Sequence, residues 1–551
     1  MNKLTKTAVR VIPLGGVEER ENHLTLLEVD EDVFILDSGQ LRPEQEMLGV
    51  DRVIPDLTPI VERSQRVKGI FLTKADPAHF GALPILLQVI HTKVFATKET
   101  IQQAKRWCQE HEVPVRSNTF QEVTSGDVFQ VGNTKIRPFA TSTLTIGSCG
   151  YGFHTDEGWV VYTGTMSLQP GEKAPFRTDM RVLQQLGAER VRLLLPETIG
   201  LTNTGPKRTY SSVTAQLENW VEQAEQTVLA TIHEQDTKRI FQLLEVANRV
   251  GRKVTFHGKR TSAFVKGLFQ YNPQWKDEGY VVPPQKAKLL PSDAVLHVFV
   301  GREEEPYEAL RKWTNRLQQG DVVLLLTHWL WGREVQLSRY VNELYRKDVD
   351  VHSLVKSTRG EEQTSRGELE WLLEFLQPAQ CIPLGGEYQM LLACQSLWER
   401  QQKEPSHAAL PEKGDILLCD GQKGIEREGT VTKGHVFIDG KGVGDIGQVV
   451  LRDRKWLSED GVVSIVIPLH SRTKLLAAQP QCVTRGFVYK KQSAALLERI
   501  TNVVAELVEA QSPIYDWADL KQKVKDVVQK ELFDATKRRP VILPIIVEIR
   551  Q

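Results

Sequence analysis

The sequence predicts an α/β protein built from several domains, and three observations support this. The chain has 551 residues, which is enough for two to four domains with sizeable cores. Apolar strands alternate with helical segments over 83–195 and again over 206–365, the pattern of sheets covered by helices. Residues 462–551 instead follow a strand–helix–helix–strand pattern, which predicts a separate small α+β domain.

The composition narrows the possible functions and the compartment. The chain carries 70 basic and 70 acidic residues, which excludes a broadly polycationic protein but permits a local basic groove of the kind a nuclease uses. The N-terminal stretch MNKLTKTAVRVIPLGG has no apolar signal sequence, and no segment approaches the ~18 apolar residues of a membrane helix. Six scattered cysteines form no C-x-x-C pair, so we expect a reduced, cytoplasmic protein without membrane insertion.

The first strands are predicted at 9–14, 23–29 and 33–36, with turn residues between them. Asp37-Ser38-Gly39 closes the second hairpin. An aspartate at the end of a strand either supports a neighbouring loop or caps the turn, and both interpretations stay open.

Residues 71–82, FLTKADPAHFGA, join a strand to a helix. The apolar strand ends at Thr73, Pro77 marks a polar turn, and the apolar run from Leu83 begins a helix. Strand–turn–helix edges are where α/β enzymes place their chemistry, so this stretch is the first candidate for a functional site.

The same stretch resembles the metal-binding loop T-H-x-H-x-D-H-x-G of the metallo-β-lactamase superfamily. Thr73, His79 and Gly81 match this motif. The other ligand positions hold Lys74, Asp76 and Ala78. On this resemblance Asp37 belongs to the D-x-G element, whose aspartate supports the metal loop.

Further elements follow in order along the chain. Helices are predicted at 83–90, 99–111, 211–226, 238–250 and 368–376. Strands are predicted at 93–97, 128–131, 134–140, 159–164, 227–232, 253–256, 295–300 and 321–327.

Four strings carry a more specific resemblance, at 47–56, 442–461, 485–489 and 536–547. They identify the chain as similar to the ribonuclease J family, in the β-CASP group of that superfamily, and most similar to the catalytically degenerate paralogue of Gram-positive bacteria. The resemblance implies a metallo-β-lactamase αββα sandwich with an inserted β-CASP α/β domain and a small C-terminal α+β domain. The implied parts are 1–205 and 366–446 for the sandwich, 206–365 for the insertion, and 447–551 for a linker and oligomerisation domain.

The metal ligands of that family are mostly replaced. The seven ligand positions hold Lys74, Asp76, Ala78, His79, Thr143, Thr165 and Gly385, of which only His79 keeps its expected ligand. Glu197 retains the acid at the end of its strand. Two-metal hydrolysis requires several imidazoles and a bridging carboxylate, so we expect no zinc or manganese at the catalytic site, with Asp76 and His79 as the weak remaining donors.

Two charge arrangements are predicted around these positions. Lys74 is expected to form a salt bridge with Asp76 or Asp37 in place of the missing ions, with a rebuilt metal site as the alternative. The resemblance also implies a structural calcium site at Gly49, Asp51 and Asp445, because a hard cation prefers such oxygen ligands. The alternative there is a pair of turn-capping aspartates.

The resemblance implies contacts to RNA in the insertion and in the turn that follows it. These positions hold Gln235, Lys238, Arg239, Arg359, Gln363 and Ser365. The phosphate-binding loop of the family reads Gly301-Arg302-Glu303-Glu304 here, and its acids would repel a phosphate.

Three functions follow, and whether the chain is an enzyme stays open. The first is a protein of mRNA decay and rRNA maturation with weak or no nuclease activity, which binds RNA and pairs with an active ribonuclease J. The second is an active metal-dependent 5′–3′ exoribonuclease and endoribonuclease, and the third is a scaffold without RNA contact. The C-terminal domain is expected to form a homodimer or hetero-tetramer, and its apolar strand 540–547 is either core or a partner-binding edge.

Overall fold

The structure, a computed structural model, describes residues 7–550 apart from 45, 117, 170, 204–206, 272–274, 276–278, 328–333, 355–360, 402, 422, 441, 445–446, 488–493 and 512–515. The chain forms two compact units, Met1–Arg42 with Val53–Val436, and Pro43–Arg52 with Phe437–Gln551. The second unit thus begins ten residues before the boundary at 447 that the sequence suggested, and it includes a short segment from the N-terminal part of the chain.

The first unit begins with an eight-stranded sheet of order β20-β19-β1-β2-β3-β5-β6-β7. Its strands are β1 (Val9–Gly15), β2 (Leu24–Val29), β3 (Asp32–Leu36), β5 (Val67–Phe71), β6 (Lys93–Ala96), β7 (Phe120–Glu122), β19 (Asp415–Asp420) and β20 (Gly424–Thr430). Strands β3, β5, β6 and β7 run parallel. The helices α1 (Thr58–Glu62), α3 (Leu83–Val89) and α4 (Lys98–Glu110) connect them.

A second sheet of six strands packs face to face with the first. Its strands are β8 (Phe129–Val131), β9 (Thr134–Ala140), β10 (Cys149–Thr155), β11 (Gly158–Gly164), β12 (Val191–Pro196) and β18 (Gln380–Cys381). Between the sheets, the ring of Phe71 meets the edge of Tyr151 at 5.3 Å and that of Phe153 at 5.1 Å. Aromatic rings of this size supply much of the apolar area that holds such layers together.

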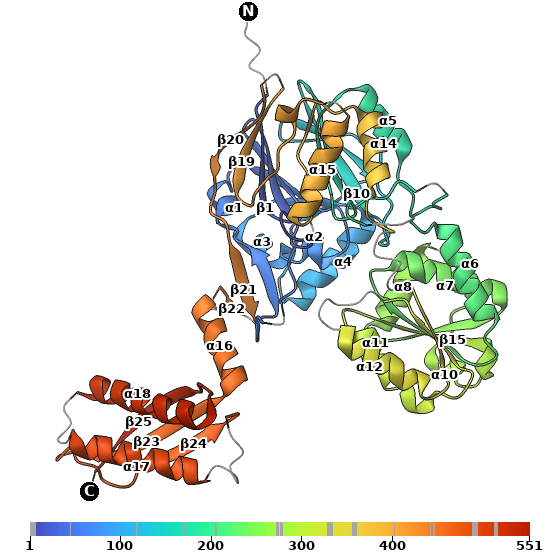
Figure 1. The fold of residues 1–551 in the computed structure, drawn as a ribbon. Helices are drawn as coiled ribbons and strands as arrows, with labels where there is room; N and C mark the ends of the chain where they lie inside the picture. Colours follow the sequence, from blue (N-terminus) through green and yellow to red (C-terminus); the bar gives the residue numbers. More distant parts are fainter. Residues whose placement is uncertain are drawn as a thin grey trace, which may run out of the picture. The chain divides into compact units, whose positions relative to one another are not determined.

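Helices α5 (Met180–Ala188), α14 (Arg366–Leu376) and α15 (Tyr388–Arg400) cover the outer face of the second sheet. Their buried Leu183, Leu372 and Leu397 pack around Trp159 of β11. The inner face of the first sheet is occupied by the second sheet, so its connecting helices lie on the outside. This gives an α/β/β/α sandwich built from the two ends of the first unit (Figure 1).

The insertion between β12 and α14 contains a five-stranded parallel sheet of order β14-β15-β13-β16-β17. Its strands are β13 (Val228–His233), β14 (Lys253–His257), β15 (Val295–Gly301), β16 (Val322–Leu325) and β17 (Asp350–Ser353). Its helices are α6 (Tyr210–Glu222), α7 (Thr237–Val250), α8 (Thr261–Tyr271), α10 (Pro284–Ala287), α11 (Glu305–Arg311) and α12 (Glu334–Tyr345), with 3-10 turns at Ser292–Ala294 and Thr314–Arg316. One face packs against α6, α7 and α8 and the other against α11 and α12, so the sheet is doubly wound (Figure 1).

The strand order of this sheet reverses at β13, and α7 follows directly from it. In open α/β sheets, ligands bind beyond the carboxyl end of the strands at such a switch point. The turn after β13 meets the sandwich: the N–H of Lys238 donates to the carbonyl of Leu144 at 2.9 Å, and the N–H of Ile146 donates to the hydroxyl of Thr237 at 2.8 Å.

The second unit contains a three-stranded sheet of order β24-β23-β25. Its elements are α16 (Gln448–Asp460), β23 (Val462–His470), β24 (Gln481–Arg485), α17 (Ala494–Ala510), α18 (Trp517–Thr536) and β25 (Val541–Ile549). The shorter strands β4 (Arg52–Pro55), β21 (His435–Asp439) and β22 (Gly442–Val443) lie where the chain passes between the units, and the 3-10 turn Pro405–His407 precedes β19. Helices α17 and α18 pack against one face of the sheet, where alternate residues of β23 are fully buried.

The sequence located most elements of the alternating parts within a few residues. Several strands were not anticipated, among them β7, β10, β17 and β24. In β10 the run CGYGFHT contains two glycines, which disfavour a strand locally, but its pairing with β9 and β11 buries it in the middle of the second sheet. Tertiary pairing, rather than local preference, therefore makes this segment a strand.

All six cysteines are free thiols. Over the described ranges, we find no helix with the length and hydropathy that crossing a bilayer requires.

The histidine pair in the inserted sheet leads to a prediction about pH. The rings of His257 and His297 stack with centroids 5.2 Å apart, and Nε2 of His257 lies 2.9 Å from Nδ1 of His297. Burial, and for His257 also the charges of His297, Arg316 and Lys288, lowers the pKa of each histidine to about 4. An unfolded chain protonates both near pH 6.5, so it binds more protons than the folded chain between pH 4 and 6.5.

We therefore expect stability of the insertion to fall as the pH decreases through this window, by at most ~1.4 kcal/mol per pH unit for each histidine. The measurement is the midpoint of urea unfolding, monitored by tryptophan fluorescence. Trp313 reports on this region because its ring centroid lies 4.7 Å from that of His297. His257→Phe should give a shallower pH dependence, whereas His91→Gln, at an exposed position, should keep that of the parent chain. Equal midpoints at pH 7.5 and 5 would contradict this account.

Candidate functional site

The loop between β5 and α3 is folded by short, local interactions. Asp76 accepts a hydrogen bond from the N–H of Ala78 at 2.9 Å and thereby caps the single-turn helix α2 (Pro77–Phe80). Pro77 occupies the first turn of α2, where its missing N–H costs nothing. The loop thus fixes His79 on a rigid turn at the edge of the sandwich, and Asp76 serves as its cap.

The carboxylate of Asp37 is the fixed point of the site. It is fully buried and accepts hydrogen bonds from the N–H of Thr73 at 2.8 Å and from the hydroxyl of Tyr162 at 2.8 Å. Its Oδ2 lies 3.0 Å from Nδ1 of His79. Asp37 therefore supports the loop, as the resemblance implied, rather than capping its own turn. Burial and the Asp37 charge raise the pKa of Tyr162 well above its ordinary value.

Gly39 lets the loop approach this aspartate closely. A Cβ atom at Gly39 would lie 1.9 Å from the carbonyl oxygen of Ala78, so only glycine fits there. The same carbonyl accepts a hydrogen bond from the N–H of His23 at 2.9 Å, and the N–H of Gly39 donates to the carbonyl of His23 at 2.8 Å. The loop therefore holds the start of β2 beside it.

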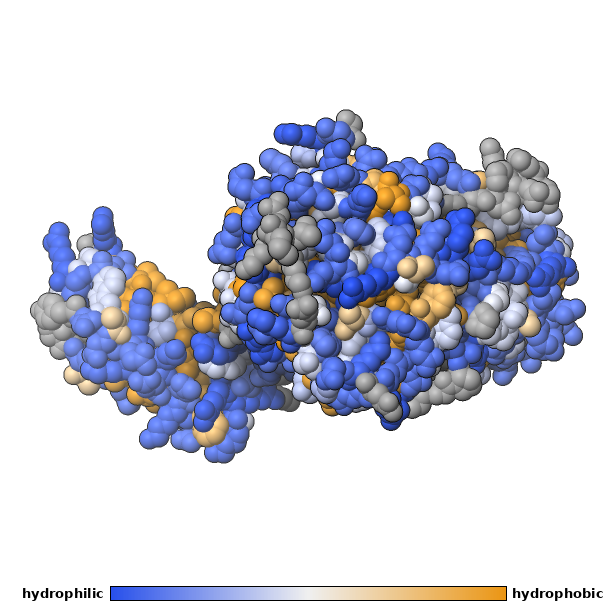
Figure 2. Space-filling view, turned by 90° about the horizontal axis from the view of Figure 1, so that it is seen from above, coloured by the Kyte–Doolittle hydropathy of each residue, from blue (hydrophilic) through white to orange (hydrophobic). Residues whose placement is uncertain are grey.

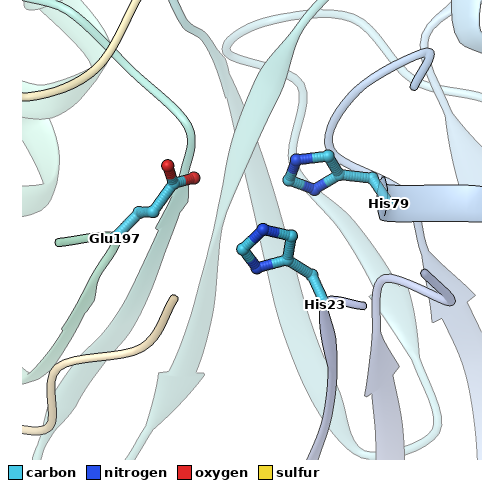
Figure 3. Close-up of side chains that lie close together, drawn as sticks. All are labelled: His23, His79 and Glu197. Carbon is cyan, nitrogen blue, oxygen red and sulfur yellow. The ribbon is translucent and has the colours of Figure 1, made fainter. Parts of the chain in front are cut away.

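His23 is a site residue that sequence reasoning missed. Its buried ring stacks on that of His79 with centroids 4.4 Å apart and planes 9° apart (Figure 3). The ring lies against two glycines: a Cβ at Gly16 would come within 3.0 Å of its Nδ1, and one at Gly385 within 2.9 Å of its Cε1. Its position in an apparently ordinary strand gave no signal, because only the fold brings residues 23, 79 and 385 together.

The pKa values of the two histidines are shifted in opposite directions. Burial, followed by the nearby charge of His79, lowers the pKa of His23 to about 3, so His23 is neutral at physiological pH. Burial also disfavours the charged form of His79, but the charge of Asp37 and its hydrogen bond outweigh it and raise the pKa of His79. Because Nδ1 of His79 faces the carboxylate of Asp37, we place the proton on Nδ1, which leaves Nε2 facing the hydroxyl of Thr165 at 3.3 Å.

Glu197 completes the group from the opposite sheet. It follows β12, and its Oε2 accepts a hydrogen bond from the hydroxyl of Thr165 at 2.5 Å. Burial raises the pKa of this carboxyl, although the charge of His79 and the hydrogen bond from Thr165 oppose the shift. Each of His23, His79 and Glu197 offers one ligand atom, and these atoms all lie within 4.8 Å of one another. In Figure 3 the carboxylate points toward the two rings.

The expected partners of Lys74 were wrong. Its buried ammonium lies 2.6 Å from Oε2 of Glu362, in the segment that leads from the insertion into α14. The carboxylate of Glu362 also accepts from the N–H of Leu144 at 3.3 Å. Burial opposes the ammonium charge, but Glu362 more than compensates and raises the pKa of Lys74. Neither Asp76 nor Asp37 contacts the ammonium directly, although the Lys74 charge contributes to a lowered pKa of Asp76 against the effect of burial.

These residues do not fit a two-metal centre. The hydroxyl of Thr143 is already engaged by Ser148 at 2.7 Å and by the carbonyl of Thr145 at 2.9 Å. The hydroxyl of Thr165 donates to Glu197, and Gly385 offers no side chain. With the Lys74 ammonium in the same pocket, a second cation would face a positive charge and lack its ligands.

A cavity of about 380 Å³ opens over this group between the sandwich and the insertion. Its charged lining residues are the acids Glu21, Asp76, Glu197, Asp236 and Glu362 and the bases Arg20, Arg42 and Lys74. The bases are ion-paired: Arg20 with Glu387 at 2.7 Å and Arg42 with Glu21 at 3.4 Å. The carboxylates outnumber the cations, so the pocket favours a cation over a phosphate.

Comparison with known proteins places this fold and site in a family. Residues 449–549 match the ribonuclease J C-terminal domain. Over its full length the chain is 31% identical to Ribonuclease J2 of Bacillus subtilis (strain 168), covering 100% of both chains. It is also 31% identical to Ribonuclease J 2 of Streptococcus pyogenes serotype M3, covering 99% of this chain and 100% of the relative.

The chain belongs to the ribonuclease J family. A further relative, Ribonuclease J 2 of Staphylococcus saprophyticus, is 31% identical over 98% of each chain. A crystal structure of a protein of unknown function from Enterococcus faecalis V583 has a TM-score of 0.51 and 13% identity, and it covers 75% of this chain and 100% of its own. This likeness concerns the fold alone. The predicted metallo-β-lactamase and β-CASP fold class is confirmed by family membership and by the observed layers.

The residues predicted to contact RNA do not all lie on the surface of the cavity. Gln235 and Gln363 line the cavity, and the Oε1 of Gln363 accepts a hydrogen bond from Asn203 at 3.0 Å. Ser365 instead caps α14: its hydroxyl accepts from the N–H of Glu368 in a capping box. Arg359 lies outside the described residues.

Lys238 and Arg239 serve the packing of the insertion. The Lys238 ammonium lies 2.6 Å from Glu172, and the Arg239 guanidinium lies 2.7 Å from Glu361. Both side chains are almost completely buried. We therefore remove these two residues from the expected RNA surface, because each cation is enclosed and already balanced by a carboxylate.

The predicted calcium loop belongs to the second unit. Asp51 accepts a hydrogen bond from the N–H of Gly440 at 2.7 Å, and Asp445 lies outside the described residues. The Arg454 guanidinium donates to the carbonyl of Leu48 at 2.9 Å, and its Nη1 would lie 2.5 Å from a Cβ at Gly49. A cationic side chain thus already neighbours this loop.

The Lys74–Glu362 pair gives a prediction about stability. Lys74→Met removes the ammonium beside a carboxylate that is only 21% exposed, so we expect about 2–4 kcal/mol of destabilisation. The double variant Lys74→Met with Glu362→Met should recover much of this loss. Chemical denaturation of the parent chain, the two single variants Lys74→Met and Glu362→Met, and the double variant measures the coupling between the two side chains.

The matched control is Arg249→Met in the exposed pair of Arg249 and Glu245, where we expect less than about 0.5 kcal/mol. If the losses at Lys74 and Glu362 simply add in the double variant, the two side chains are not coupled and the pair does not stabilise this region.

Proposed function

We propose that this chain is a ribonuclease J-type protein of RNA processing and decay that has lost two-metal hydrolysis. It binds RNA, pairs with an active ribonuclease J, and contributes little or no nuclease activity of its own. We infer a cytoplasmic location from the same role.

One observation carries this proposal: the Lys74 ammonium, ion-paired to Glu362, occupies the loop where the family motif places a metal ligand. Two-metal sites activate the attacking water and clamp both the attacking and the leaving oxygen. The hydroxyls of Thr143 and Thr165 are engaged by protein partners and cannot replace an imidazole or a bridging carboxylate. These residues therefore lack the ligands that two-metal hydrolysis of a phosphodiester requires.

Access for RNA is supported at the rim of the cavity. The side chains of Arg20 and Arg42 are 31% and 46% exposed and line the same cavity as the amides of Gln235 and Gln363. Their guanidinium groups are already paired with acids, so we expect weak, salt-sensitive binding that depends on backbone charge. The acid-rich interior of the cavity argues against a tightly held phosphate there.

Pairing with an active paralogue is supported by the second unit. Helices cover one face of its sheet, while the other face exposes Leu543, Ile545, Val547 and Val483, each between 42% and 50% exposed. Figure 2 shows hydrophobic surface on this unit. Strand β25 has side chains for both roles considered from the sequence, because Ile542 points into the core while its neighbours face outward.

The experiment that tests the whole proposal uses the full-length protein purified from cells that lack the active paralogue. A 5′-monophosphorylated RNA is incubated with it, and both digestion and binding are measured. Binding without digestion supports the proposal. Digestion at a rate comparable to an active family member supports the nuclease alternative, and absence of both supports the scaffold alternative.

A variant of the loop sharpens this test. Lys74→His restores one family ligand, but Ala78, Thr143 and Gly385 still lack theirs, and single members of a cooperative site contribute little alone. We expect no measurable gain in RNA digestion with Zn²⁺ or Mn²⁺ added. Lys74→Met removes the same ammonium without adding an imidazole and is the control. A rise of tenfold or more that is specific to histidine would refute the loss of the site.

Association is tested on the exposed sheet face. Ile545→Lys combined with Val547→Lys places two charges on it without touching the buried Ile542. We expect this variant to elute as a monomer in size-exclusion chromatography with light scattering and to lose co-purification with the active paralogue. Val335→Lys on α12, where the residue is 63% exposed, is the control. Unchanged oligomers would place the interface elsewhere.

A further inference from the structure

The loss of the family's two-metal centre leaves a different donor set in the same pocket. We propose that His23, His79 and Glu197 bind a single divalent transition-metal ion, and that the ion is Zn²⁺. His23 is not among the family ligand positions, so this site is a new one assembled from one retained ligand, one retained acid and one imidazole from the start of β2.

The three side chains come from separate elements and converge on one point. Their nearest ligand atoms lie within 4.8 Å of one another, and Figure 3 shows the Glu197 carboxylate facing the two rings. Zinc bonds to nitrogen and oxygen are ~2.0–2.2 Å long, which places the ligands of a tetrahedral ion about 3.4 Å apart. Closing the group around an ion requires the two stacked rings, whose planes are 9° apart, to turn toward each other as the ion binds.

Asp37 orients the ring of His79 as a carboxylate commonly orients a metal-binding histidine. The Nδ1 of this ring lies 3.0 Å from Oδ2 of Asp37, and with the proton on Nδ1 the lone pair of Nε2 faces Thr165 and Glu197. Metal-binding histidines commonly donate their other N–H to a carboxylate, which fixes the tautomer and makes the ring a better donor. Asp37 is itself held by Thr73 and Tyr162, so this support is rigid.

His23 is held by shape rather than by hydrogen bonds. Within the described part of the chain, no hydrogen bond reaches its ring nitrogens. The ring instead fits between Gly16 and Gly385, where a Cβ at Gly385 would lie 2.9 Å from the ring and 2.8 Å from Cγ of Glu197. The glycine at 385, where the family motif has a histidine, therefore makes room for the imidazole of His23. One imidazole is lost from the pocket and another enters it.

The charges around the group are compatible with one cation. Glu197 and Asp37 together offset a divalent charge, and the Lys74 ammonium is balanced by Glu362 at 2.6 Å. Two imidazoles and one carboxylate form the donor set of several zinc sites that keep an open fourth position. Imidazole nitrogens also disfavour Mg²⁺ and Ca²⁺, which prefer oxygen ligands.

This inference revises the expectation, based on the sequence alone, that no transition metal binds in the catalytic pocket. It is independent of the proposed function, because one ion does not form the two-ion clamp that phosphodiester hydrolysis in this family requires. RNA binding and metal binding can therefore succeed or fail separately.

The test uses the full-length protein, stripped with a chelator and then dialysed against Zn²⁺ or Co²⁺. Elemental analysis should give one equivalent of zinc per chain, and Co²⁺ should give the visible absorption of a four-coordinate ion. His23→Gln should weaken zinc binding by at least 100-fold, whereas His91→Gln, which removes an exposed imidazole elsewhere, should leave the affinity unchanged.

A second variant guards against misfolding of the first. Asp37→Asn keeps all three ligands but removes the carboxylate beside His79, and we expect a 10- to 100-fold loss of zinc affinity. Circular dichroism and RNA binding, each with and without Zn²⁺, report on folding and on the proposed function. The inference is overturned if the parent chain retains less than 0.1 equivalent at excess zinc, or if His23→Gln binds zinc like the parent.

Discussion

The buried carboxylate of Asp37 is the interaction on which the site depends. It ties the end of β3 to the loop through Thr73, to the second sheet through Tyr162, and to His79 through the ring nitrogen. A fully buried carboxylate must have its oxygens satisfied by hydrogen bonds, and Thr73, Tyr162 and His79 supply them here. These hydrogen bonds hold the loop, the end of β3 and the second sheet together around the pocket.

Cationic side chains of the chain itself are paired with carboxylates around the pocket. Lys74 and Glu362 connect the sandwich to the segment after the insertion, and Lys238 and Arg239 make similar buried pairs with Glu172 and Glu361. Each such pair stabilises the region only while both partners remain, because a single enclosed charge is costly.

The second unit has one covered and one exposed apolar sheet face. Its sheet buries one face under α17 and α18 and leaves alternating apolar residues of β25 on the other. An edge strand with an exposed apolar face is a natural surface for another copy or a related chain.

The sequence by itself determined the family, the alternation of strands and helices, and the loss of ligands at 74, 78, 143, 165 and 385, because these follow from local patterns and motif spacing. It could not give the partner of Lys74, the enclosure of Lys238 and Arg239, or the strand β10, because these depend on residues far apart in the chain. His23 is the clearest case. Only the folded chain brings its ring against His79, Gly16 and Gly385, since the close approach is decided by the space that two glycines leave.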